Sequence, residues 1–265
     1  MTPIDMLLIG AGGFAAGAVN AMAGGGTFFS FPALLAAGLP PVVANASNSV
    51  ALWPGSLSGA WAYRQELAAY RRYLLPMGVA SLLGGAAGGL LLLAAGDARF
   101  AALIPLLLAF ATVLFAFSPQ LSALVRRLKS GQPAGPAPAA AGQHGAGSPA
   151  GWLAQLLVSV YGGFFGAGMG ILMMASLQIG GHDNVQHVNA LKNLLSAVIY
   201  SVTVITFIVA GAVSWPHTAL MLLTASLGGY AGARLARRLR GPWLRRLVIA
   251  AGCVLTLYYF AKAAG

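Results

Sequence analysis

Charged residues are scarce in this sequence, and acidic residues are the scarcest. Charged residues make up 7% of the 265 positions, and four of them are aspartate or glutamate. A soluble globular domain carries about 25% charged residues, so this chain lacks the polar surface that a water-soluble fold needs. With 58% hydrophobic residues, the composition is typical of an integral membrane protein.

Cysteine is almost absent as well. Cys253 is the single cysteine, so the chain cannot form an intrachain disulfide bond. No acidic residue falls in the middle of an apolar run, which gives little support to a carboxylate-based sodium or proton site. His182 and His187 are too few for a metal site of three or four ligands. We therefore expect no metal and no other cofactor.

Long apolar runs occupy most of the chain instead. They are continuous and about 17 to 25 residues long, the length of a membrane-crossing helix. They lack the alternation of a membrane β-barrel, and backbone groups in lipid must be satisfied within the segment, which leaves helices. We expect apolar segments at about 6–22, 27–37, 44–63, 73–95, 100–117, 152–167, 171–179, 188–210, 218–235 and 244–260.

The basic residues give the chain a net charge of +11. Such a charge can serve nucleic-acid binding, but here the arginines lie in short loops between apolar runs. This is the positive-inside pattern of membrane proteins. We therefore expect no nucleic-acid partner, and we expect the basic loops to be cytoplasmic.

A stretch rich in glycine, proline and alanine divides the chain. It begins with three basic residues, and from Ser130 to Pro149 it has no aliphatic residue larger than alanine. Such a composition cannot build a core and is typical of a disordered linker. The sequence predicts a first transmembrane repeat at 1–125, a cytoplasmic linker at 126–149 and a second transmembrane repeat at 150–265.

Two glycine-rich breaks indicate an internal duplication. Gly24–Gly26 interrupts the first apolar run, and Gly168-Met-Gly170 follows the sixth at positions that differ by 144. The same separation relates further pairs: Asn45 and Asn189, Ala46 and Ala190, Gly84 and Gly228, and Gly88 and Gly232. Each half therefore carries one broken helix.

The arginines predict that the two halves have opposite orientations. The loop 64–72 is basic and its counterpart 210–216 has no charge, whereas the loop 234–246 holds six arginines and its counterpart 90–102 holds one. Equivalent loops thus lie on opposite sides of the membrane, as in inverted-topology repeats. We expect an all-α, multi-pass membrane protein with both termini outside. It would have about eight helices by hydropathy, or ten segments if each repeat has a broken helix or re-entrant hairpin with a short piece.

The glycine breaks are the predicted binding site. Glycines let the backbone turn and leave N–H groups unpaired at a new helix start, where the helix dipole also favours an anion. In many transporters two such breaks meet at the bilayer midplane around the substrate. The alternative is that glycines only permit close helix packing, which we prefer for Gly84, Gly85, Gly88 and their counterparts. The backbone residues of the predicted site are Gly24, Gly25, Gly26, Thr27, Gly168 and Gly170.

Polar side chains follow both breaks within the next long segment. Asn45, Asn48 and Ser49 in the first half align with Asn189, Lys192 and Asn193 in the second. Residues three apart share a helix face, and polar groups in a membrane helix usually face the protein interior or a water-filled path. Lys192 would supply a positive charge to an anionic substrate, or it would snorkel to the surface because it lies near the helix start.

Near that helix start, His187 is a candidate proton relay. Asp183 or Asn184 would simply cap the helix.

The run GGGTFFSFPALLAAGLPPVVANASNS and its weaker second copy resemble the TauE/SafE family of membrane permeases, the sulfite-exporter family. The resemblance covers nearly the whole chain outside the linker. It rests on the glycine break, Pro32 and the polar patch 45–49; in the second copy Met169 and Ser176 replace the central glycine and the proline. The resemblance implies a permease of the bacterial inner membrane that exports a small sulfur oxyanion, such as sulfite, or an organosulfonate.

The leading hypothesis is therefore a transporter of a small anion that works by alternating access of two repeats. Its partners would be that substrate and the lipid bilayer, with the oligomeric state open. Another small anion or a metabolite as substrate, and either the membrane potential or a proton as driving force, also stay open. We do not expect an enzyme. An intramembrane enzyme with Ser47 or Ser49 as nucleophile and Lys192 as base matches no known catalytic motif, and a structural or sensory subunit is a third alternative.

Overall fold

The computed structural model describes most of the chain: residues 1–23, 25–65, 67, 71–130, 149–179, 185–235 and 241–264. Within these ranges the elements are nine α-helices: α1 (Pro3–Ala23), α2 (Thr27–Ala36), α3 (Pro41–Ala62), α4 (Arg71–Ser130), α5 (Pro149–Phe164), α6 (Met169–Ile179), α7 (Val185–Val209), α8 (Trp215–Leu235) and α9 (Gly241–Ala264). The prediction of an all-α, multi-pass membrane protein is confirmed.

α4 consists of two helices that meet at Gly96. This glycine has φ 69° and ψ 174°, a left-handed conformation that glycine adopts without the steric penalty of a Cβ atom. The Asp97 carboxylate accepts the backbone N–H of Val42 at 2.8 Å, which satisfies one of the unpaired donors at the start of α3. With α4 counted as two helices, the described chain has the ten segments that the apolar runs predict.

The helices on either side of the predicted linker are longer than the apolar runs indicate. α4 continues to Ser130 and α5 begins at Pro149, so residues 126–130, which the sequence assigns to the linker, are helical. A helix can extend beyond its apolar part because its hydrogen bonds do not depend on side-chain polarity. The rest of the predicted linker, 131–148, lies outside the described residues.

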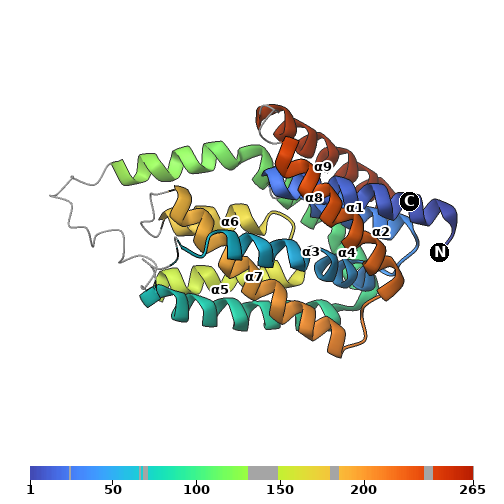
Figure 1. Cartoon of the computed structure of the whole chain (residues 1–265), viewed down its shortest axis with the longest axis horizontal. Helices are drawn as coiled ribbons and strands as arrows, with labels where there is room; N and C mark the ends of the chain where they lie inside the picture. Colours follow the sequence, from blue (N-terminus) through green and yellow to red (C-terminus); the bar gives the residue numbers. More distant parts are fainter. Residues whose placement is uncertain are drawn as a thin grey trace.

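Most helices run roughly along the long axis of the molecule (Figure 1). Both termini lie at one end, whereas the end of α4 and the start of α5 lie at the other. By length and apolar composition, the stretches Pro3–Asn20, Leu74–Ser118 and His187–Val209 can cross a membrane. Large apolar side chains cover the outside, as Leu75 at 77% exposure and Val209 at 83% show. Such an apolar surface is suited to contact with lipid.

Two helix pairs have matching roles in the two halves. α1 packs along α8, and α5 packs along the first part of α4. A Cβ atom at Gly88 would lie 2.1 Å from the carbonyl oxygen of Val160, and one at Gly228 would lie 2.0 Å from that of Phe14. Backbones this close require small residues at the crossing. The packing role preferred for these glycines agrees with the structure.

α3 and α7 cross between the halves and run antiparallel. A Cβ atom at Gly59 would lie 3.5 Å from Cγ of Asn193, and the Trp53 indole donates a hydrogen bond to the Ser201 hydroxyl at 2.9 Å. Residue numbers therefore rise along one helix where they fall along the other. Because these two helices carry the polar patches, this pairing decides how the patches lie relative to each other.

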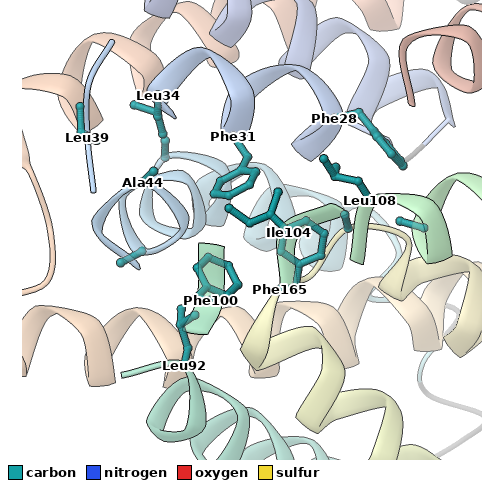
Figure 2. Close-up of a cluster of buried hydrophobic side chains, with 14 of the residues drawn as sticks. Phe28, Phe31, Leu34, Leu39, Ala44, Leu92, Phe100, Ile104, Leu108 and Phe165 are labelled. Atoms are coloured by element: carbon teal, nitrogen blue, oxygen red, sulfur yellow. The ribbon is translucent and has the colours of Figure 1, made fainter. Parts of the chain in front are cut away.

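An aromatic cluster joins the halves next to the breaks (Figure 2). Phe31 of α2 makes an edge-to-face contact with Phe165, which follows α5, at 5.5 Å between ring centroids. Phe100 of α4 lies 6.1 Å from Phe31 and 6.2 Å from Phe165. All three rings are buried, and such pairs stabilise a core beyond the area they bury. The cluster holds α2, α4 and the end of α5 in one core.

The glycine contacts generate a matched pair of substitutions in α4. Gly88→Ala should destabilise the protein by about 1–3 kcal/mol, because the added methyl group overlaps the α5 backbone. A Cβ atom at Gly78 meets nothing within 4 Å, so Gly78→Ala should be neutral or slightly stabilising. Thermal unfolding in detergent would measure both. Equal melting temperatures for the two variants would contradict the close packing of α4 on α5.

Candidate functional site

The first break joins α1 to α2 through tightly packed glycines. Gly26 has helical dihedral angles, φ −56° and ψ −39°, and a Cβ atom there would lie 2.6 Å from the Ala16 carbonyl oxygen. A Cβ atom at Gly25 would lie 2.9 Å from the Phe115 ring. Glycine is therefore needed at these two positions for space and not for a left-handed backbone. Gly24, the third predicted residue, lies outside the described residues.

The second break has a different geometry. Gly166 and Gly168 have positive φ angles, +82° and +78°, in the left-handed region that favours glycine. The carbonyl of Ala167 between them accepts a hydrogen bond from the Tyr161 hydroxyl at 2.5 Å. Here the glycines do let the backbone turn, as predicted for Gly168. Gly166 was missed, because the residue 144 positions earlier, Met22, is not a glycine.

Two polar side chains lie at the breaks. The Tyr200 hydroxyl of α7 lies near the Thr27 side chain at the first break, and it would lie 3.4 Å from a Cβ atom at Gly166 of the second. Asn45 of α3 donates a hydrogen bond from Nδ2 to the carbonyl of Phe164, at 3.1 Å. The two breaks thus lie close together in the core: Tyr200 of α7 adjoins both, and Phe31 of α2 contacts Phe165. Asn45 of α3 bonds to the second break.

Asn45 has an acceptor that nothing satisfies. The residue is 1% exposed, and no group among the described residues donates a hydrogen bond to its Oδ1. The bond from Nδ2 to a carbonyl fixes which amide atom is which, so Oδ1 is the free acceptor. Leaving a buried polar atom unpaired costs about 1–3 kcal/mol. A ligand with an N–H or O–H group, or a water molecule, would satisfy Asn45 Oδ1.

The rest of the first polar patch is engaged within the protein. Asn48 Oδ1 accepts a hydrogen bond from the Ser30 hydroxyl of α2, and the Ser49 hydroxyl donates to the Asn45 carbonyl at 2.9 Å. The Ser47 hydroxyl accepts the backbone N–H of Ser214 at 3.0 Å. These bonds hold α3 against α2 and the start of α8. Among the described residues, no hydrogen bond joins Ser47 or Ser49 to Lys192.

Lys192 lies beside the second break but away from Tyr200. A Cβ atom at Gly170 would lie 3.5 Å from Lys192 Cδ, so the lysine side chain packs against the start of α6. Eight residues separate Lys192 from Tyr200, about 12 Å along the helix. Within the described ranges no hydrogen bond or ion pair joins Lys192 to a carboxylate. Lys192 therefore places a positive charge between the breaks and the end of the molecule where α7 begins.

The remaining predicted residues lie along the same helix. Asn189 is half-buried one turn before Lys192, and Asn193 faces Gly59 of α3. His187 is half-buried in the first turn of α7. His182, Asp183 and Asn184 lie outside the described residues.

Sequence reasoning missed Tyr200 and Ser30 as well as Gly166. Tyr200 lies in the middle of the run 188–210, next to Ser201, and Ser30 interrupts the apolar residues of α2. A polar group in the middle of an apolar segment is itself a signal, and here it was available in both cases. Their partners, Thr27 and Asn48, could not be deduced because they lie on other helices.

These features define a class: a multi-pass α-helical membrane protein in which two interrupted helices meet in the core beside buried polar side chains. The model of the family "Sulfite exporter TauE/SafE" matches residues 9–259, so the chain belongs to this family. The resemblance seen in the glycine break is confirmed, and the family places the chain among membrane transport proteins.

Curated relatives span nearly the whole chain. A "Probable membrane transporter protein" of Haemophilus influenzae is 26% identical over 92% of this chain and 90% of its own length. "Probable membrane transporter protein ORF9" of Sinorhizobium sp is 26% identical over 94% of this chain and 89% of its own. "Probable membrane transporter protein YfcA" of Escherichia coli K12 is 26% identical over 91% and 84%. No solved structure matches the chain.

The Asn45 bond generates a prediction about stability. Asn45→Leu leaves the Phe164 carbonyl without its donor in an apolar core, which should destabilise the protein by about 1–3 kcal/mol. Thr206→Val is the control, because the Thr206 hydroxyl bonds only to the Val202 carbonyl of its own helix, at 2.9 Å. Thermal unfolding in detergent would compare them. If both variants melted together with the parent protein, Asn45 would not connect the breaks.

Proposed function

We propose that this chain exports a small anion across the bacterial inner membrane by alternating access of two inverted repeats, with sulfite or an organosulfonate as the substrate. The observation that carries the proposal is the meeting of the two helix breaks in the core, where Phe31 of α2 packs on Phe165 and Tyr200 adjoins Gly166. Irregular backbone at membrane depth persists where it is buried in protein or lines a cavity. Transporters built from repeats place their substrates at such a junction.

The charges around the breaks favour an anion. α2 and α6 both begin at a break, so the positive ends of two helix dipoles lie there. Lys192 packs against the start of α6. The described acidic residues, Asp5 and Asp97, lie near the start of α1 and at the α4 kink. The electrostatic field of the two helix starts and Lys192 therefore stabilises a negatively charged solute.

The free acceptor of Asn45 limits which anions can bind at the site. Oδ1 needs a donor, whereas a fully deprotonated oxyanion offers only acceptors. An oxyanion that keeps one proton, such as hydrogen sulfite, or a sulfonate with an N–H group supplies both kinds of contact. The hydroxyls of Tyr200 and Thr27 can donate to its oxygens.

The helix arrangement supports two inverted repeats. α1 with α8 and α5 with the first part of α4 are equivalent pairs when the halves are exchanged. α3 and α7, which are equivalent in sequence, are antiparallel. The basic loops assign the linker end of the molecule to the cytoplasm. A membrane potential that is negative inside then favours exit of the anion by about 2.3 kcal/mol per charge for each 100 mV. Export therefore needs no coupling ion.

The transport itself can be measured with purified protein in liposomes. Efflux of sulfite that depends on the protein and on an inside-negative potential is the expected result. Turnover of the anion without transport would indicate an enzyme, and neither flux nor turnover would favour a structural or sensory subunit. Testing sulfite, sulfate and organosulfonates in the same liposomes would identify the substrate.

Lys192→Ala should reduce this flux about tenfold or more, because the anion loses the positive charge beside the second break on its path to the linker end, and a contact to a charged group is worth about 1.5–3 kcal/mol. Lys262→Ala is the matched control, because Lys262 is exposed in the last turn of α9. Both variants should be expressed and folded like the parent protein. Flux at the parental rate in Lys192→Ala would remove this lysine from the transport path.

Gly25→Leu should abolish flux, because its side chain would displace Phe115 and Val248 from the first break. Gly55→Leu is the control: Gly55 is an exposed position in α3 where a Cβ atom meets nothing within 4 Å. Initial rates in liposomes at equal protein content would compare the two. Normal flux through Gly25→Leu would mean that the first break does not take part in transport.

A further inference from the structure

A groove on the side of the molecule includes no residue of either helix break. It has a volume of about 570 Å³ and lies between α3, the first part of α4 and α7. Its apolar walls include Leu57, Trp61, Leu82, Leu194, Val198 and Ile205, and Arg64 is the charged residue that borders it. Nothing in the transport proposal uses this groove.

The walls of the groove accept an apolar occupant. Ser201 is the polar side chain along its length, and its hydroxyl already accepts the Trp53 indole N–H at 2.9 Å and donates to the Ala197 carbonyl at 2.7 Å. Away from Arg64, a small anion would find no free partner along these walls. Trp61 and Ile205 are 69% and 58% exposed, so the groove opens sideways, toward the hydrocarbon of a bilayer.

The length of the groove matches one leaflet. It extends along α7 from Leu194 to Ile205, about 16 Å at the rise of an α-helix. Half of a hydrocarbon core of about 30 Å is about 15 Å. A single acyl chain that enters from one side of the membrane therefore spans the groove.

Arg64 determines which lipid fits. It follows the end of α3, and its guanidinium lies 4.6 Å from the ring centroid of Trp61 and donates to the Trp61 carbonyl at 3.1 Å. Trp and Arg in this position are typical of a membrane–water interface. In the described part of the chain no carboxylate forms an ion pair with Arg64, and a guanidinium binds phosphate oxygens with two parallel hydrogen bonds.

We propose that this groove binds one acyl chain of an anionic phospholipid, with the phosphate against Arg64. Basic sites between membrane helices on the cytoplasmic side recognise anionic headgroups, and Arg64 belongs to the basic loop 64–72. The bound acyl chain contacts both α3 and α7. The lipid therefore stabilises the packing of these two helices, which carry Asn45 and Tyr200. The site depends on the membrane location alone and not on the identity of the transported anion.

Native mass spectrometry of the purified full chain tests the proposal, with phosphatidylglycerol and phosphatidylcholine of identical acyl chains as probes. The parent protein should retain phosphatidylglycerol about fivefold more tightly, the effect expected for one basic residue at an anionic membrane surface. Arg64→Gln should abolish that preference. Arg99→Gln, which removes an exposed arginine near the α4 kink, should keep it.

A second variant tests the acyl-chain part of the site. Ala60→Phe places a ring in the groove and should weaken the retention of both lipids, with the fold checked by size exclusion and circular dichroism. Equal retention of the two lipids by the parent protein would overturn the proposal, as would an unchanged preference in Arg64→Gln. Cross-linking at Leu57 that joins two copies of the chain would assign the groove to a dimer instead.

Discussion

A helix that is interrupted inside a membrane leaves backbone N–H and C=O groups that lipid cannot satisfy. The rest of this structure depends on meeting that requirement twice. The Tyr161 hydroxyl and the Asn45 amide reach carbonyls at the second break, and the Gly25 and Gly26 carbonyls at the first accept the N–H groups of Phe28 and Phe29. Because the side-chain donors at the second break come from α5 and α3, that break is satisfied where these two helices pack together.

Packing around the breaks makes this arrangement rigid. Phe31, Phe100 and Phe165 meet from three elements of both halves, and the glycines of α4 and α8 let α5 and α1 approach to backbone contact. A close-packed core of this kind has few intermediate states, so pairs that span the two halves, such as α1 with α8, move as bodies and not by gradual deformation.

Much of the candidate site was predictable, and the misses have physical reasons. The duplication placed Thr27 and Asn45 beside the breaks, because the glycine interruptions and polar patches are local patterns. Gly166 was missed because the two breaks are built differently: the first needs space beside Ala16 and Phe115, and the second needs a left-handed backbone. The grouping of Lys192 with the asparagines stays a prediction: Lys192 packs against Gly170 beside the second break, and Asn193 faces Gly59 of α3.

The sequence alone determines that this is a multi-pass helical membrane protein with ten segments. The bilayer sets the length of each apolar run and keeps these runs nearly free of charge. Family membership and the position of both breaks also follow from local residue patterns. The tertiary structure decided which groups satisfy the breaks, that Asn45 keeps a free acceptor, and that a groove bordered by Arg64 opens beside α7. Apart from the Tyr161 bond to Ala167, these depend on residues separated by more than a hundred positions, whose contacts exist only once the helices have packed.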